Sequence, residues 1–281
     1  MDRRIDWRAL YRPAAQRLAL DLVSIACCLT STTISRPLMV MGLNFPTPLG
    51  IAAGFDRNGR LARRVGALGF GFNEIGSLTA SEVCQLKPVL QGKSRLGINL
   101  TLDAKSSTAD ICEQLRSAWP HGDYLVLNLI GPASAPFLQQ TARLRNLLST
   151  LRKELDQLNL TGGRRVPLVA KLRCLPGQIP FSLTGLLLDV ELDGLLAAHD
   201  PGPPATRERY RAWQDQQQQR LACEQIEHLR RFCGEDMALM SVGGIQTAGH
   251  LQARMNAGAE LVQVHAALLR QGPWLAHRLL R

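Results

Sequence analysis

The sequence lacks clustered cysteines, which excludes two common ways of stabilising a small fold. Seven cysteines are scattered along 281 residues, their number is odd, and no C-x-x-C pair occurs. We therefore expect neither a disulfide framework nor a zinc site, and no other metal site is predicted. This cysteine usage fits a reduced, cytoplasmic setting best.

Signatures of nucleic-acid binding are also missing. The chain has 33 Lys and Arg against 23 Asp and Glu, which gives a formal net charge of +10. Such an excess favours anionic ligands or surfaces. However, the sequence contains no dense Lys/Arg run and no aromatic signature of an RNA-binding domain, so no nucleic-acid partner is expected.

The N-terminal apolar run is too short to cross a membrane. A spanning helix needs about 20 apolar residues, whereas this run is shorter and contains Asp21, which also argues against a secretory signal. Two interpretations stay open for residues 1–36: packing across the bottom of the fold, which we favour, and peripheral contact with the inner face of a membrane. The run predicts one stripe of an amphipathic helix, formed by Leu18, Leu22, Ile25, Ala26 and Leu29.

From Pro48 onward, apolar runs alternate with helical patterns. The runs lack strict alternation, which is typical of parallel strands covered on both faces. Eight such units predict a closed (β/α)8 TIM barrel, residues 39–281, preceded by an N-terminal helical extension, residues 1–38. The expected strands are 48–55, 70–78, 95–100, 124–129, 166–173, 193–199, 237–243 and 261–268, and the clearest helices are 104–119, 137–158, 206–233 and 247–257.

The ends of the expected strands carry a set of residues suited to a planar ring with a phosphate. Working residues of a TIM barrel lie at these ends. The small residues 52–54 leave room for a flat ring on the backbone. Asn99, Asn128 and Lys171 end apolar strands, where each needs a polar or anionic partner. Gly243 and Gly244 expose backbone N–H groups in the region where barrels bind phosphate.

Each of these features has an ordinary alternative at the rim of a barrel. The small residues also fit a tight strand-to-helix turn, and each polar residue also fits a hydrogen-bonded rim position. Jointly, they resemble the flavin site of the dihydroorotate dehydrogenases, in particular the quinone-linked branch with its N-terminal helices. The resemblance runs through most of the chain, and its main stretches are Pro48–Gly59, Glu74–Thr79, Leu96–Asn99, Pro167–Lys171 and Ser241–Ile245.

The resemblance implies FMN as cofactor, a small-molecule substrate and a quinone acceptor. It implies that Lys171 stabilises the negative charge of the reduced ring. Arg57 stands where the family has lysine, so the charge is kept with a different shape. The residues that the resemblance places around FMN are Ala52, Ala53, Gly54, Arg57, Gly76, Ser77, Asn99, Asn128, Lys171, Gly243, Gly244, His265 and Ala266.

The substrate side departs from the family pattern. Gly131 stands where the family has its serine base, and Ala133 stands where it has a substrate-binding asparagine. The family's Thr-Asn-Thr has become 198–200, Ala-His-Asp. Only residues 80–94 remain where the family has an asparagine-rich loop, and a Gln-rich helix replaces a Leu-Ser-Gly-Arg turn. We therefore expect no useful oxidation of dihydroorotate.

Three functions remain open. The first is an FMN-dependent dehydrogenase that acts on a CH–CH group of another substrate, with His199 and Asp200 as the replacement acid/base pair. Ser134 is a further candidate, if the loop is refolded. The second is a catalytically degenerate barrel that acts as a binding or regulatory protein. The third is a flavin-free barrel for a phosphorylated ligand, such as an isomerase, although the small residues 52–54 favour a flat ring.

Overall fold

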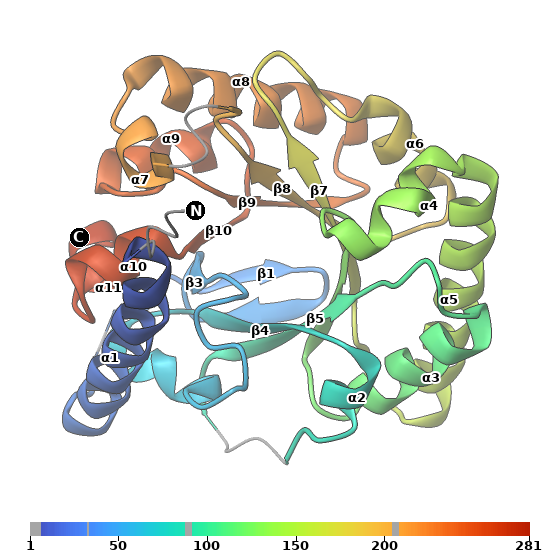
Figure 1. Cartoon of the computed structure of the whole chain (residues 1–281), viewed down its shortest axis with the longest axis horizontal. Helices are drawn as coiled ribbons and strands as arrows, with labels where there is room; N and C mark the ends of the chain where they lie inside the picture. The colour runs from blue at the N-terminus through green and yellow to red at the C-terminus, as the bar shows by residue number, and fades with distance from the viewer. Residues whose placement is uncertain (1–6, 33, 88–91, 204–207) are drawn as a thin grey trace, which may run out of the picture.

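Eight parallel strands close into a barrel in the computed structural model of the chain, which describes residues 7–32, 34–87, 92–203 and 208–281. The strands follow one another around the ring, and the last pairs with the first (Figure 1). The predicted TIM barrel is therefore confirmed. The strands are β3 Leu49–Ile51, β4 Phe72–Leu78, β5 Arg95–Thr101, β6 Tyr124–Asn128, β7 Leu168–Cys174, β8 Gly194–His199, β9 Ala238–Val242 and β10 Leu261–Val264.

The barrel interior is filled by large side chains and closed by a hairpin. The hairpin consists of β1 Leu38–Val40 and β2 Leu43–Phe45, which pair antiparallel and lie across the middle of the ring in Figure 1. Phe45 of β2 meets Phe72 edge-on at 5.5 Å between ring centroids. This packing seals the amino-terminal end of the barrel, so ligands enter from the carboxyl ends of the strands.

Helices surround the strands and bury a second apolar layer against them. Two of the expected helices are divided. Residues 137–158 form parts of α4 and α5, which meet at Gln140, and residues 206–233 contain α7 and α8. The helices are α1 Trp7–Leu29, α2 Ala80–Val83, α3 Thr108–Ala118, α4 Ala135–Gln139, α5 Thr141–Thr161, α6 Phe181–Asp189, α7 Arg209–Ala212, α8 Gln216–Cys233, α9 Ala248–Asn256, α10 Ala266–Gln271 and α11 Leu275–Leu279, with 3-10 turns η1 Ala62–Leu68 and η2 Pro132–Ser134.

Helix α1 packs on the side of the barrel and leaves much of its apolar stripe in solvent. Val23, Ala26 and Cys27 are buried. The other predicted stripe residues are exposed, at 61% for Leu18, 50% for Leu22, 57% for Ile25 and 81% for Leu29. Ala26 is thus the only member of the predicted stripe that is buried. Residues 1–6 of the predicted extension lie outside the described part of the chain. Nowhere in the described ranges is a helix both long and apolar enough to span a bilayer.

Candidate functional site

A chain of buried polar side chains crosses the upper part of the barrel. Asn99 Nδ2 donates to Glu74 Oε1 at 2.7 Å, and Gln263 Nε2 donates to the other carboxylate oxygen of Glu74. Ser77 Oγ donates to Asn99 Oδ1, and Asn128 Nδ2 donates to Ser77 Oγ at 2.7 Å. The predicted residues Ser77, Asn99 and Asn128 are therefore brought together. Asn99 is fully buried, whereas Asn128 is half-buried and uses one Nδ2 hydrogen inside the protein, which leaves a second for another acceptor.

Glu74 and Gln263 belong to this chain although the sequence analysis did not single them out. Both are fully buried. The sequence did contain a sign of their role. Each is a polar residue inside an apolar strand, where its side chain must find a hydrogen-bond partner. They hold the two asparagines in fixed positions at the ends of β5 and β6.

Among the described residues of this site, Lys171 is the one buried side chain that has no partner. It lies on β7 with 8% of its surface exposed. No hydrogen bond or ion pair from the described part of the chain reaches its ammonium group. A buried ammonium is costly unless an anion or a strong acceptor faces it. The position therefore calls for a ligand.

Lys171 lines a cavity of about 200 Å³ at the carboxyl ends of β7, β8, β9 and β10. The predicted residues Gly243, Gly244, His265 and Ala266 line the same cavity. Gln263 lines it too, which connects the cavity to the polar chain through Glu74. The cavity and the polar chain are thus two parts of one site at the mouth of the barrel.

Glycines shape the walls of this site. Gly54, Gly243 and Gly244 have φ values of +97°, +114° and +86°, which other residues rarely adopt. A Cβ on Gly54 would lie 3.5 Å from His265 Nε2, and a Cβ on Gly244 would lie 2.6 Å from the Trp213 ring. The turn at 52–54 therefore meets the cavity at His265. Gly76 serves the fold as well, since a Cβ there would lie 2.4 Å from the Asn99 carbonyl oxygen.

Arg57 does not belong to the cavity lining. Its side chain is 54% exposed, and its guanidinium forms an ion pair with Glu82 of α2 at 2.8 Å. Glu82 also closes the capping box at the start of α2. The geometry thus gives Arg57 a role at the rim rather than the ring-side position that was predicted.

His265 is held neutral at the edge of the cavity. Its ring packs edge-on against Phe55 at 6.2 Å between centroids. Burial lowers the pKa of His265, and the positive charges of Lys171 and Arg209 lower it further. The side chain is therefore a neutral donor and acceptor, and its backbone begins α10 beside the cavity.

The imidazole of His199 is engaged on the side of the helix layer, away from the ring-facing orientation that was predicted. Successive side chains of a strand point to opposite faces. Along β8, Leu195 and Ala197 face the helix layer, so His199, two residues after Ala197, faces it too. Its Nδ1 is 2.7 Å from Gln225 Oε1 of α8, and its Nε2 is 3.1 Å from Ser241 Oγ of β9. Burial, together with the charge of Arg254, lowers the pKa of His199 to about 3. His199 lines the cavity, but both of its ring nitrogens are engaged by partners inside the protein.

Asp200 and Ser134 are also held by neighbours. Asp200 accepts hydrogen bonds from the Gly202 backbone at 3.1 Å and from Arg209 at 2.9 Å. Ser134 is buried, and its hydroxyl donates to the Gly131 carbonyl oxygen at 2.9 Å. Their catalytic roles remain predictions that the geometry does not favour, because both groups are already engaged inside the protein.

His199 is expected to make the protein sensitive to acid. The imidazole titrates near 6.5 in the unfolded chain but near 3 in the folded protein. The unfolded state binds the proton first, so the free energy of unfolding falls as the pH drops below 6.5 toward 3. The loss at pH 5 is about 2 kcal/mol. Urea unfolding of wild type and His199→Gln at pH 7 and pH 5 checks this. Equal losses of stability in both proteins would contradict it.

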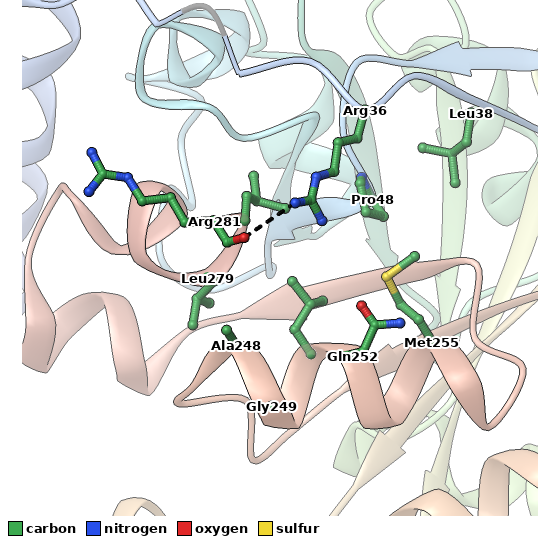
Figure 2. Close-up of a pocket in the computed structure, with 11 residues that line it drawn as sticks. Arg36, Leu38, Pro48, Ala248, Gly249, Gln252, Met255, Leu279 and Arg281 are labelled. Carbon is green, nitrogen blue, oxygen red and sulfur yellow. Dashed lines mark hydrogen bonds between the residues drawn. The ribbon is translucent and has the colours of Figure 1, made fainter.

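A second cavity lies along α9, beside the end of α11 and the segment 36–48 (Figure 2). Its volume is about 390 Å³, and its walls include Leu38 at the start of β1, Pro48 before β3 and Met255 of α9. Arg36 donates to the Arg281 carbonyl oxygen at its edge, at 3.5 Å. It contains none of the predicted site residues, so the larger cavity is not the candidate site.

Comparisons with known proteins identify the family. No protein-family model matches the sequence. The ligand-free DHODH of Eimeria tenella has the same fold, with a TM-score of 0.76 and 21% identity over 95% of this chain and 92% of its own. The dihydroorotate dehydrogenase (quinone) of Cellvibrio japonicus is 30% identical and covers 85% of this chain and 83% of its own length. This chain belongs to the dihydroorotate dehydrogenase (quinone) family.

A second relative leads to the same assignment. The dihydroorotate dehydrogenase (quinone) of Stenotrophomonas maltophilia is also 30% identical, over 85% of this chain and 81% of its own length. The predicted family and enzyme class, an oxidoreductase acting on a CH–CH group, are therefore confirmed.

Proposed function

We propose that this chain is an FMN-dependent oxidoreductase that acts on a CH–CH group of a substrate other than dihydroorotate. The observation that carries the cofactor assignment is Lys171, a buried cation without a partner among the described residues, in a cavity bounded by positive-φ glycines. The change of substrate is inferred from Gly131, which has no side chain at the position of the family's serine base. The test is the spectrum of the purified protein before and after addition of dihydroorotate.

The residues present fit FMN. Positions 52–54 offer bare backbone for the ring, and the spare amide hydrogen of the half-buried Asn128 can donate to its heteroatoms. The backbone N–H groups of Gly243 and Gly244 suit the phosphate, and Lys171 suits an electron-rich edge of the ring. FMN, when bound, supplies the capacity to take two electrons from a C–H bond and pass them on.

The substrate side lacks a proton-transfer group in the family position. Gly131 has no side chain, the Ser134 hydroxyl already donates to the Gly131 carbonyl, and His199 faces the helix layer. General base catalysis contributes about 10²–10⁴ in rate, so its loss is decisive for dihydroorotate. A substrate with a more acidic C–H bond, or one that brings its own base, would suit this site better.

Lys171 is predicted to set the reduction potential of the flavin. Removing its charge in Lys171→Met disfavours negative charge on the ring, so the potential should fall. A lost interaction of about 1.4 kcal/mol corresponds to about 30 mV for a two-electron couple. Redox titration of the bound flavin against reference dyes measures this, with Lys171→Arg as the charge-conserving control. An unchanged potential in a Lys171→Met protein that still binds FMN would make Lys171 a rim residue only.

We propose that a quinone acceptor reaches the site along helix α1 and that the same helix contacts a membrane. Gln16 Nε2 of α1 donates to the Gly54 carbonyl and lies 3.5 Å from the Phe55 carbonyl oxygen. The helix is thus tied to the turn that we assign to the flavin ring. Its exposed stripe, Leu18, Leu22, Ile25 and Leu29, offers apolar surface that suits the interface of a bilayer.

The double variant Leu22→Gln/Ile25→Gln should lose vesicle binding and quinone reduction while its flavin content stays unchanged. Burial of each such side chain is worth about 1.5–3 kcal/mol, so the affinity for vesicles should fall at least about tenfold. Co-sedimentation with anionic vesicles measures it. The control is Leu160→Gln, which removes from α5 a leucine that is even more exposed (77%). Equal vesicle binding by the double variant and the control would leave α1 a packing element only.

A barrel that has lost catalysis is the second candidate. It is favoured by His199 and Ser134, whose polar side-chain atoms are hydrogen-bonded inside the protein. The two functions differ in the fate of chemically reduced, protein-bound flavin. An enzyme of this family reoxidises it with a soluble short-chain quinone at a saturable rate, whereas a binding protein shows no acceleration over free flavin.

A further inference from the structure

Helix α7 and Trp213, which follows it, form one wall of the flavin cavity. Arg209, Tyr210 and Trp213 all line it. The sequence pattern predicted only a long helix for these residues. Because α7 is short and followed by Asp215, the N-cap of α8, they turn toward the mouth of the barrel instead of continuing the helix.

This wall is attached to the Gly243–Gly244 turn by several hydrogen bonds. Gln219 Nε2 donates to the Trp213 carbonyl at 2.8 Å and to the Gly244 carbonyl at 2.7 Å. Gln246 Nε2 donates to the Tyr210 carbonyl at 2.6 Å. The Trp213 ring packs directly against Gly244. The wall and the proposed phosphate turn therefore form one unit.

Arg209 brings a positive charge to this unit. Of the described side chains that line the cavity, only Lys171 and Arg209 carry a fixed positive charge. Both line the cavity together with His265 and Ala266, at the start of α10. Arg209 is paired with Asp200 at 2.9 Å, but its side chain is still 55% exposed, so its remaining N–H groups can reach another anion.

We propose that Arg209 binds the phosphate group of FMN and makes the site select the phosphorylated flavin over riboflavin. This inference rests on the proposed function. Backbone N–H groups contribute only partial charges, whereas a guanidinium offers a full charge and paired donors that match phosphate geometry. Lys171 lies on β7 and is assigned to the ring. Arg209 lies on the wall that Gln219 joins to Gly244, and of the two cations that line the cavity it is the one on the phosphate side. Arg254 also donates to the Gly243 carbonyl, at 3.4 Å, but it is fully buried and does not line the cavity.

The experiment titrates the full-length protein, stripped of bound flavin, with FMN and with riboflavin, and follows flavin fluorescence. Arg209→Gln should raise the Kd for FMN about tenfold, as expected for the loss of one charge-assisted contact, and leave the Kd for riboflavin unchanged. The matched control is Arg211→Gln. It removes an arginine of the same helix that is 79% exposed, paired with Glu208, and absent from the cavity lining.

Arg209→Gln also removes one partner of the Asp200 carboxylate, and this change at Asp200 could by itself weaken the binding of a phosphate nearby. The double variant Arg209→Gln/Asp200→Asn separates the two effects. If Arg209 contacts the phosphate, the double variant still binds FMN more weakly than wild type; recovery of wild-type affinity would overturn the proposal.

Equal weakening of FMN and riboflavin by Arg209→Gln, or no change in either, would also overturn the role of Arg209. A wild-type protein that binds neither flavin would refute the proposed function itself. The two failures are therefore distinguishable.

Discussion

Replacing Gly244 by leucine is expected to empty the flavin site while the barrel stays folded. Gly244 has φ of +86°, and a Cβ there would lie 2.6 Å from the Trp213 ring. The turn must therefore shift, and its backbone N–H groups leave their positions. Two hydrogen bonds to a charged phosphate are worth about 1.5–3 kcal/mol each, so the affinity for FMN should fall roughly hundredfold or more.

The strain itself is too small to unfold the protein. A residue forced into this backbone region costs about 1–3 kcal/mol, against a typical folding stability of about 5–15 kcal/mol. Flavin content after purification and far-UV circular dichroism measure the two effects separately. Gly249→Ala in α9 is the control, since a Cβ there meets only Thr247 Oγ1 at 3.8 Å. A Gly244→Leu protein with full flavin content would remove the phosphate assignment.

Restoring serine at position 131 alone is expected to recover little oxidation of dihydroorotate. The side chain itself fits. Gly131 has φ of −75°, and its Cβ would meet only Ser134 Oγ at 3.9 Å. A correctly placed base is worth about 10²–10⁴ in rate. That gain requires a bound substrate, and the family's asparagines are missing from position 133 and from the segment 80–94.

The single variant Gly131→Ser should therefore stay within about tenfold of wild type, a small part of what a base supplies. The double variant Gly131→Ser/Ala133→Asn should oxidise dihydroorotate faster than the single variant. Stopped-flow mixing of the flavin-loaded variants with dihydroorotate measures these rates, and Gly131→Ala controls for the added Cβ. A gain of about a hundredfold or more from serine alone would mean that substrate binding is intact and that only the base was lost.

The barrel could be predicted because its strands are long apolar runs at regular intervals. Because these runs are apolar on both faces, the sequence does not show which side chains of each strand face the interior. In β8, Leu196 faces inward while Leu195 and Ala197 face the helices, yet all three are apolar. The sequence alone thus left undefined which side of the strand the His199 ring faces, and its partners Gln225 and Ser241 became evident only in the structure.

Site residues that stand out in the local sequence were easier to predict than those that depend on contacts between distant side chains. The glycines at 54, 243 and 244 and the buried Lys171 stand out in the local sequence, because a positive φ favours glycine and a buried charge needs a counterpart. The polar chain through Glu74 depends on contacts between distant strands. The wall with Arg209 and Trp213 depends on a break between two helices, which a continuous polar pattern concealed.

One measurement tests the central claim most directly: the visible absorption spectrum of the purified full-length protein, recorded anaerobically before and after adding dihydroorotate. We expect a flavin spectrum, with FMN identified by mass after extraction, that stays oxidised after the addition. A colourless protein that takes up no added FMN would contradict the cofactor assignment. Rapid bleaching by dihydroorotate would contradict the change of substrate.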